Sequence, residues 1–232
     1  MMTPGEGRPT GSSDTERVVG VQTGAVTLAG DLRVPHDALG IVLFAHGSGS
    51  SRFSPRNRYV ARFLNGGRLA TLLIDLLTQE EEAVDMRTAH LRFDVALLGQ
   101  RLAGVTDWVA QQPDTRHLRI GYFGASTGAA AALIAAAARP DLVAAIVSRG
   151  GRPDLAGPAL TRVRAPTLLI VGARDVAVIE LNRQAFEQLR AEKELVVVPN
   201  ATHLFEEPGA LDAVAWRTRD WFTRHLAPAK AA

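Results

Sequence analysis

Three residues have the types and the order of a nucleophile, an acid and a base. Ser126 lies in Gly124-Ala-Ser126-Thr-Gly128, which matches the pattern G-x-S-x-G, and Asp175 and His203 follow it in the chain. A serine hydroxyl attacks a carbonyl carbon efficiently only when a base removes its proton. A histidine base in turn needs a carboxylate that holds its tautomer and stabilises its positive charge. The order serine, aspartate, histidine therefore predicts acyl-transfer chemistry through a covalent intermediate.

Each of these residues also has a purely structural interpretation. Ser126 could occupy an ordinary glycine-rich turn, His203 could be a loop histidine, and Asp175 could serve only to cap the helix predicted after it. Asp154 is a rival for the role of the acid, but it follows an earlier strand than Asp175 does. The G-x-S-x-G segment lies between an apolar run and a helix of small residues, and this context favours the catalytic interpretation.

A second glycine-rich segment, His46-Gly-Ser-Gly, follows another apolar run. We expect the main-chain N–H groups of Ser48 and Thr127 to form an oxyanion hole, because a loop of this kind and the residue after the nucleophile supply such donors. His46 and Gly47 are candidate substrate-binding residues, although His46 is expected to be structural and not a second base. The segment lacks the pattern G-x-x-x-x-G-K-[ST], which argues against nucleotide binding.

Two arginines add candidates for substrate binding. Arg149 and Arg152 follow an apolar run and could bind an acidic substrate group through paired hydrogen bonds. Salt bridges within the protein are the competing and more common explanation. Glu80-Glu-Glu82 has no histidine at metal-ligand spacing, so we expect no metal site. The chain has no cysteine, which excludes disulfides, thiolate metal ligands and a cysteine nucleophile.

Short apolar runs mark the strands that would position these residues. The runs are apolar on both faces and are bounded by Gly, Pro, Asp or Asn, as parallel strands covered by helices are. Ligands bind at the carboxyl ends of such strands. Six loops should therefore share one edge of the sheet, and they begin at His46, Asp75, Gly124, Arg149, Gly172 and Pro199. The predicted strands are 41–45, 69–74, 118–123, 142–147, 167–171 and 195–198.

Helical patterns alternate with these strands. Apolar residues that step by three and four from Leu91 to Val109 predict one continuous helix over roughly 82–111. Glu206-Glu-Pro208 should open the last helix, with acids near its positive end and proline in its first turn. Residues 17–34 predict an antiparallel hairpin with Gly24 at or near its turn. The other predicted helices are 55–65, 127–139, 177–191 and 208–226.

The composition of the chain fits one α/β domain. Of its 232 residues 47% are hydrophobic, which is enough for a large core. We predict a flexible tail over 1–16, a single domain over 17–226 and a frayed end over 227–232. A formal net charge of +2 gives no reason to expect nucleic-acid binding. Because no apolar run has membrane-spanning length and the first residues lack a secretory signal, we expect a cytoplasmic protein without membrane contact.

With these motifs in this order, residues 40–226 resemble the α/β-hydrolase superfamily, and in particular its small dienelactone-hydrolase-like branch. The resemblance rests on His46-Gly-Ser-Gly, Gly124-Ala-Ser-Thr-Gly128, Gly172-Ala-Arg-Asp175 and Ala201-Thr-His203-Leu-Phe-Glu-Glu-Pro208. It implies the α/β-hydrolase fold, which has a mostly parallel central sheet, an antiparallel N-terminal hairpin and helices on both faces. It also implies an acyl-enzyme mechanism without cofactors.

Two departures from the family pattern refine this expectation. True dienelactone hydrolases use a cysteine nucleophile, which this chain lacks, so the resemblance favours a serine esterase or carboxylesterase acting on a small-molecule ester. The link over 148–166 is short, so no large lid is expected. Lactone, thioester or amide hydrolysis, or acyl transfer, would use the same three residues. A non-catalytic binding protein with the hydrolase fold is the alternative from a different class.

Overall fold

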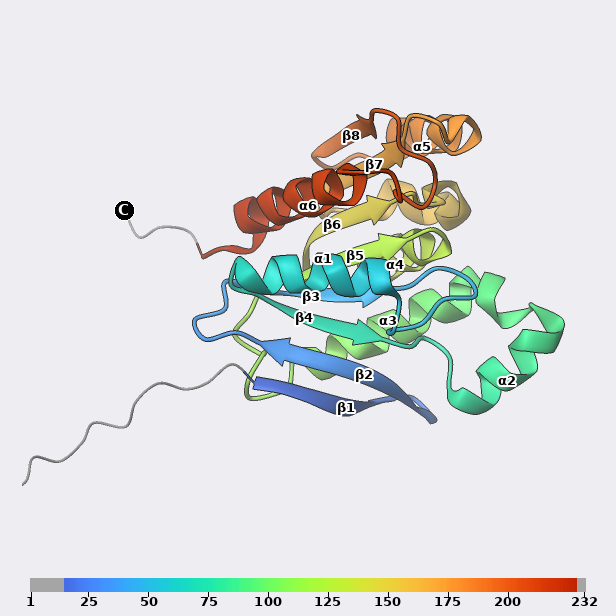
Figure 1. The fold of residues 1–232 in the computed structure, drawn as a ribbon. Coiled ribbons are helices and arrows are strands. Elements are labelled where there is room, and N and C mark those ends of the chain that lie inside the picture. Colours follow the sequence, from blue (N-terminus) through green and yellow to red (C-terminus); the bar gives the residue numbers. More distant parts are fainter. Residues whose placement is uncertain (1–14, 229–232) are drawn as a thin grey trace, which may run out of the picture.

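The computed structural model describes residues 15–228, which form an eight-stranded sheet with helices on both faces (Figure 1). The strand order is β1-β2-β4-β3-β5-β6-β7-β8. Strands β3 to β8 are parallel, β1 pairs with β2 in an antiparallel hairpin, and β2 is antiparallel to β4. The α/β-hydrolase fold predicted from the sequence is confirmed. The strands are β1 (Thr15–Thr23), β2 (Val26–Val34), β3 (Gly40–Ala45), β4 (Leu69–Ile74), β5 (Ile120–Ala125), β6 (Val143–Arg149), β7 (Thr167–Gly172) and β8 (Lys193–Val198).

The helices divide between the two faces of the sheet. Helices α1 and α6 bury their apolar residues in one core, and α3, α4 and α5 contribute to the other. The longer helices are α1 (Pro55–Gly66), α2 (Gln79–Thr88), α3 (Val95–Val109), α4 (Thr127–Ala138), α5 (Val176–Gln188) and α6 (Ala210–Leu226), and two 3₁₀ segments are η1 (Leu91–Phe93) and η2 (Pro153–Arg162).

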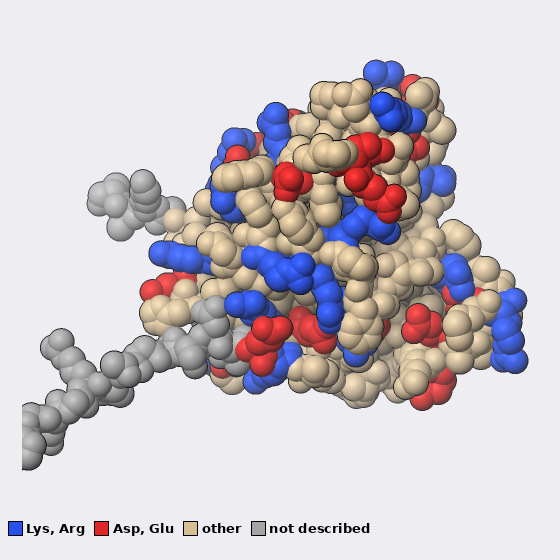
Figure 2. Space-filling model, in the orientation of Figure 1, with Lys and Arg blue, Asp and Glu red and all other residues tan. Residues whose placement is uncertain are grey.

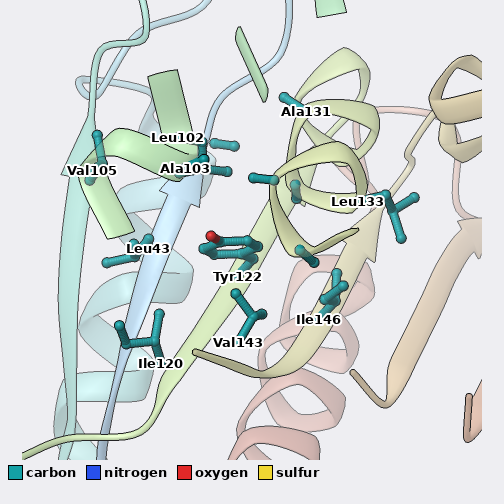
Figure 3. Close-up of a cluster of buried hydrophobic side chains, with 14 of the residues drawn as sticks. Leu43, Leu102, Ala103, Val105, Ile120, Tyr122, Ala131, Leu133, Val143 and Ile146 are labelled. Carbon is teal, nitrogen blue, oxygen red and sulfur yellow. The ribbon is translucent and has the colours of Figure 1, made fainter. Parts of the chain in front are cut away.

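The central strands are buried because both of their faces are apolar. Neighbouring residues of a strand point to opposite faces, so Leu43 and Tyr122 join one core while Phe44 and Phe123 join the other. Figure 3 shows the Tyr122 ring in the first core, beside residues of α3 and α4. Burial raises the pKa of the Tyr122 hydroxyl, which forms a hydrogen bond with Thr106. Two apolar layers therefore hold the sheet rigid beneath its carboxyl edge.

The N-terminal hairpin has the predicted turn and a slightly earlier start. Gly24 has a φ of +56°, a conformation that glycine adopts without strain, and it joins β1 to β2. Strand β1 begins at Thr15, two residues inside the tail predicted over 1–16. The rest of that tail, and residues 229–232 of the predicted frayed end over 227–232, lie outside the described residues.

The predicted continuous helix over 82–111 is wrong, because the structure divides this segment into α2, η1 and α3. Ala89 has a φ of 51° and ends α2. The Asp85 carboxylate then accepts a hydrogen bond from Leu91 N at 2.7 Å, and Asp94 caps α3 by accepting one from Leu97 N at 3.0 Å. These side chains satisfy main-chain N–H groups that the break would otherwise leave unpaired. The helix can therefore end although the apolar stripe in the sequence continues.

The last helix also begins later than predicted. Helix α6 starts at Ala210 after Gly209, whose φ is +78°, so Pro208 precedes the helix and does not lie in its first turn. The link between β6 and β7 contains only η2, and this confirms that no large lid covers the sheet edge there. Among the helices of residues 15–228, none combines the length and the apolar composition of a membrane span.

Candidate active site

The carboxyl edge of the parallel strands collects the residues singled out by the sequence. Ser126 follows β5, Arg149 ends β6, Asp175 follows β7, and His203 lies in the loop after β8. In Figure 1 these loops lie at the end toward which the arrows of the parallel strands point. The strand order places β5, β6, β7 and β8 side by side, so the sheet brings together residues that are far apart in sequence.

Ser126 has the backbone conformation of a nucleophile elbow. It joins β5 to α4 with φ 51° and ψ −123°, a combination that costs of order 1–3 kcal/mol for a residue with a side chain. A Cβ atom added at Gly124 would lie 2.5 Å from Ala129 Cα, and one added at Gly128 would lie 2.2 Å from Ala45 O. The glycines of the G-x-S-x-G segment are thus required by the close approach of the backbone on both sides of Ser126.

Hydrogen bonds of the main chain hold this elbow against the next strand. Ser126 N donates to Arg149 O at 3.3 Å, and Arg152 N donates to Ser126 O at 3.0 Å. Because these contacts do not involve side chains, the position of the serine depends on the backbone and not on the rotamers of its neighbours.

His203 and Asp175 form a close pair on the same edge. His203 Nδ1 lies 2.6 Å from Asp175 Oδ2. A carboxylate only accepts hydrogen bonds, so Nδ1 carries the hydrogen and Nε2 of the neutral ring is free to accept a proton. The rival acid Asp154 instead binds Arg152, with its two oxygens 2.9 and 2.8 Å from Nε and Nη2. Of the two candidate acids, therefore, only Asp175 contacts the histidine.

The loop that carries His203 is fastened to the loop that carries Asp175. A Cβ atom added at Gly172 would lie 2.4 Å from Ala201 O, so only glycine permits this approach. Arg174 N donates to Ala201 O at 2.9 Å, and Thr202 N donates to the Glu207 carboxylate at 3.1 Å. The hydrogen bonds from Thr202 lower the pKa of Glu207. The sequence assigned Glu207 only to the start of a helix and missed this contact.

Gly150 lies against the histidine of the site. It follows Arg149, which binds the Ser126 amide, and a Cβ atom at Gly150 would lie 3.6 Å from His203 Cε1. Within residues 15–228 the Ser126 hydroxyl forms no hydrogen bond with His203. Such hydrogen bonds are often long or misaligned in a free enzyme and tighten when substrate binds. The imidazole is 39% exposed, so it has room to turn toward the serine.

The two predicted oxyanion donors differ in their availability. Thr127 is the first residue of α4, and its N–H has no acceptor among the described residues. The positive end of the helix dipole reinforces this donor. Ser48 N, in contrast, already donates to the Thr127 side chain, with 2.9 Å between N and Oγ1. The loop that carries Ser48 approaches the nucleophile so closely that a Cβ atom at Gly47 would lie 2.9 Å from Ser126 Cβ.

His46 is held within the oxyanion loop. Its Nε2 accepts a hydrogen bond from Leu76 N at 3.3 Å, so Nδ1 of the neutral ring carries the hydrogen and donates to Gly47 O at 3.0 Å. Ser50 N donates to the same oxygen at 3.1 Å. Both nitrogens of the ring are occupied by the main chain, as expected for a structural histidine.

The two candidate arginines have different surroundings. Arg152 is occupied by Asp154, which is the salt bridge that the sequence offered as the alternative to substrate binding. Arg149 is 6% exposed, donates to Asn57 Oδ1 at 3.2 Å and faces the Phe205 ring at 5.9 Å. Burial, together with the nearby Arg56, lowers the pKa of Arg149 to about 10. No carboxylate within the described residues forms a salt bridge with Arg149.

A cavity of about 180 Å³ borders the oxyanion loop on the side of α2. The sequence did not predict it, because it arises from the break between α2 and α3. Arg92, which binds Asp85 across that break with Nε and Oδ2 2.5 Å apart, lines it. The lining residues are His46, Gly47, Ser48, Gly49, Leu77, Glu82, Asp85, Met86, Arg92 and Leu98.

Figure 2 shows basic and acidic side chains interspersed over one face of the molecule. In the described part of the chain, no cluster of three or more His, Cys, Asp and Glu residues could hold a metal ion. The chemistry available at this edge is that of a serine, an imidazole, a carboxylate and main-chain amides.

Comparisons with known proteins agree with this fold. The model of the "Dienelactone hydrolase family" matches residues 30–227. A crystal structure of a dienelactone hydrolase from Anabaena variabilis is 62% identical, with a TM-score of 0.91 over 93% of this chain and 100% of that one. Est1E from Butyrivibrio proteoclasticus, solved with ferulic acid, covers 89% of this chain and 98% of its own at 16% identity, and its TM-score of 0.74 shows the shared fold alone.

Two curated relatives come from Mycobacterium tuberculosis and are provisionally named phosphoribosyl transferases. Each is 59% identical over 208 residues, which cover 90% of this chain but only 46% of the relative. The chain thus spans about half the length of the curated relatives it matches.

Proposed function

Because the chain belongs to the dienelactone hydrolase family, we propose that it hydrolyses carboxylic esters of small molecules through an acyl-enzyme formed on Ser126. The observation that carries the proposal is the 2.6 Å pair between His203 Nδ1 and Asp175 Oδ2, on the same sheet edge as the strained elbow of Ser126. A base held in one tautomer, on the same sheet edge as an elbow serine, is an arrangement that suits acyl transfer.

The proposed reaction has two halves. In the first, Nε2 of His203 takes the Ser126 proton as Oγ attacks the ester carbonyl, and Asp175 stabilises the imidazolium that forms. The imidazolium then gives its proton to the departing alcohol, which leaves the acyl group on Oγ. In the second half, His203 removes a proton from water, which attacks the acyl carbonyl, and the acid departs as Oγ regains its proton.

A serine ester hydrolase is preferred over the related activities for two reasons. The chain has no cysteine, so the nucleophile of true dienelactone hydrolases is missing. The link between β6 and β7 contains only η2, so no large lid covers the sheet edge there. An uncovered edge suits small and varied esters. Lactone, thioester or amide hydrolysis, and acyl transfer, remain the variants that the same three residues could perform.

The names of the mycobacterial relatives describe longer proteins. This chain corresponds to 46% of each relative, and the dienelactone hydrolase model covers most of the shared segment. This overlap supports assigning hydrolase chemistry to this segment, and we do not extend the transferase name to it.

A labelling experiment tests the proposal directly. A fluorophosphonate probe should label the wild type, and Ser126→Ala should abolish labelling and lower kcat by several orders of magnitude while the thermal unfolding temperature is kept. A panel of p-nitrophenyl esters, lactones and amides would then rank the substrate classes. Equal labelling of the wild type and Ser126→Ala would refute the nucleophile, and activity confined to amides or lactones would refute the choice of esters.

A further inference from the structure

The oxyanion side of the proposed active site contains a hydroxyl that the general scheme does not use. Thr127 is 4% exposed, and its Oγ1 accepts the hydrogen bond from Ser48 N at 2.9 Å. A threonine hydroxyl also carries one hydrogen that it can donate. Within the described residues no acceptor for that hydrogen is present, neither a side chain nor the carbonyl one turn earlier in the chain. A buried donor without a protein acceptor lies next to the nucleophile.

The orientation of the Ser48 amide is fixed from its other side. The carbonyl and the N–H of one peptide point in opposite directions, because the peptide is planar and trans. Gly47 O of this peptide accepts hydrogen bonds from His46 Nδ1 at 3.0 Å and from Ser50 N at 3.1 Å. These two donors hold the Gly47 carbonyl, and the Ser48 N–H of the same peptide therefore points toward Thr127. Turning this N–H away would break both hydrogen bonds to Gly47 O.

The same loop lies against the nucleophile. A Cβ atom at Gly47 would lie 3.7 Å from Ser126 Oγ, so the Gly47–Ser48 peptide lies beside the hydroxyl of the proposed nucleophile. Thr127 directly follows Ser126 at the start of α4, and its N–H has no acceptor among the described residues.

We propose that Thr127 supplies both donors of the oxyanion hole, its main-chain N–H and its side-chain O–H, and that Ser48 acts only through the Thr127 hydroxyl. This inference rests on the proposed serine-hydrolase function and makes Thr127 a catalytic residue. The hydroxyl keeps its proton throughout and donates a hydrogen bond to the oxygen that becomes negative as Ser126 attacks. The Ser48 N–H polarises that hydroxyl, since hydrogen bonds in a chain strengthen one another. His46 is a positioning residue, because it holds the peptide that carries the Ser48 amide.

The substitution Thr127→Val separates this arrangement from the one in which Ser48 binds the oxyanion directly. Valine has nearly the size of threonine and keeps the main-chain N–H, but it removes the hydroxyl and releases the Ser48 amide. Loss of one oxyanion donor lowers kcat by about 100-fold or more, so Thr127→Val should show such a fall with little change in KM. Thr127→Ser, which restores the hydroxyl, should recover most of the loss. Unchanged or increased kcat in Thr127→Val would overturn the proposal, because it would show that the released Ser48 amide serves the oxyanion.

Thr218→Val is the matched control. Thr218 is buried in α6, its hydroxyl has no hydrogen-bond partner, and it lies outside the proposed site. The control should keep kcat and should show what a buried threonine-to-valine change does to the unfolding temperature. A loss of kcat in Thr218→Val equal to that in Thr127→Val would refute a role specific to Thr127.

The rate of labelling by a fluorophosphonate gives a second readout that needs no substrate. Charge develops on the phosphoryl oxygen as Ser126 attacks the probe, so Thr127→Val should be labelled about 100-fold more slowly than the wild type. If the wild type is labelled at Ser126 but cleaves no ester, the proposed ester substrate fails, and the ratio of labelling rates still decides the role of Thr127. Equal labelling rates for Thr127→Val and the wild type would refute the hydroxyl donor while leaving the serine nucleophile in place.

Discussion

The two halves of the proposed active site are held in place in different ways. Ser126 is fixed by the main chain, through its φ of 51°, its hydrogen bonds to residues 149 and 152, and neighbouring glycines that leave no space for a Cβ atom. The His203 ring is oriented by a side chain, Asp175, and its loop is held by the Glu207 side chain as well as by the main-chain bond between Arg174 N and Ala201 O. A defect in the first half should therefore cost folding stability, whereas a defect in the second should cost activity.

The largest expected effect tests the half that contains Asp175 and His203. Asp175→Asn keeps the size of the side chain but removes the charge that holds the His203 tautomer, so kcat should fall about 10⁴-fold. The unfolding temperature should stay close to that of the wild type, because the elbow and both cores are untouched. Steady-state kinetics and calorimetry on the same samples check this. If Asp175→Asn lost much stability but kept its kcat per folded molecule, Asp175 would serve folding and not catalysis.

Gly128→Ala tests the half held by the main chain. The added Cβ would lie 2.2 Å from Ala45 O and 2.6 Å from His46 O, so the elbow or the oxyanion loop must shift. Overpacking of this kind typically destabilises a domain by about 1–3 kcal/mol, and contacts with backbone atoms lie toward the upper end. Urea unfolding should show a lower midpoint than the wild type.

Gly66→Ala is the control for that substitution. A Cβ atom there meets nothing within 4 Å, and alanine is favoured over glycine in a helix. Its stability should be equal to or higher than that of the wild type. A stable and fully active Gly128→Ala variant would show that the elbow is not rigidly held.

Glu207→Gln gives the smallest expected effect, which is a difference in stability that depends on pH. The hydrogen bonds from Thr202 lower the pKa of Glu207 from its usual 4.5, so its contribution to stability is present above the unfolded pKa and disappears as pH falls through the folded pKa. The variant should be slightly less stable than the wild type at pH 7, and the difference should be smaller when the measurement is repeated at pH 3.

Urea unfolding at the two pH values measures this difference. Glu187→Gln, on the exposed side of α5, is the control and should match the wild type at both. A difference between Glu207→Gln and the wild type that stays constant between pH 7 and pH 3 would show that the charge of Glu207 does not hold the loop.

The sheet could be predicted from the sequence because the signals for strands are local. The run 41–45 is apolar on both faces and became β3 (Gly40–Ala45), and the G-x-S-x-G segment became the elbow between β5 and α4. The break between α2 and α3 was missed for the opposite reason. The apolar stripe from Leu91 to Val109 continues across it, and the break depends on Asp85 folding back onto Leu91 and Arg92.

The sequence by itself determined which residues could act and which edge of the sheet would carry them, because strand periodicity, turn glycines and the order of the strands are all readable along the chain. Only the tertiary structure decided how these side chains pair. It placed Asp175 against His203 and gave Asp154 to Arg152, and it joined Ser48 to Thr127 across 79 positions of the sequence. Such pairings depend on rotamers and backbone positions that distant segments impose on one another, and no local pattern encodes them.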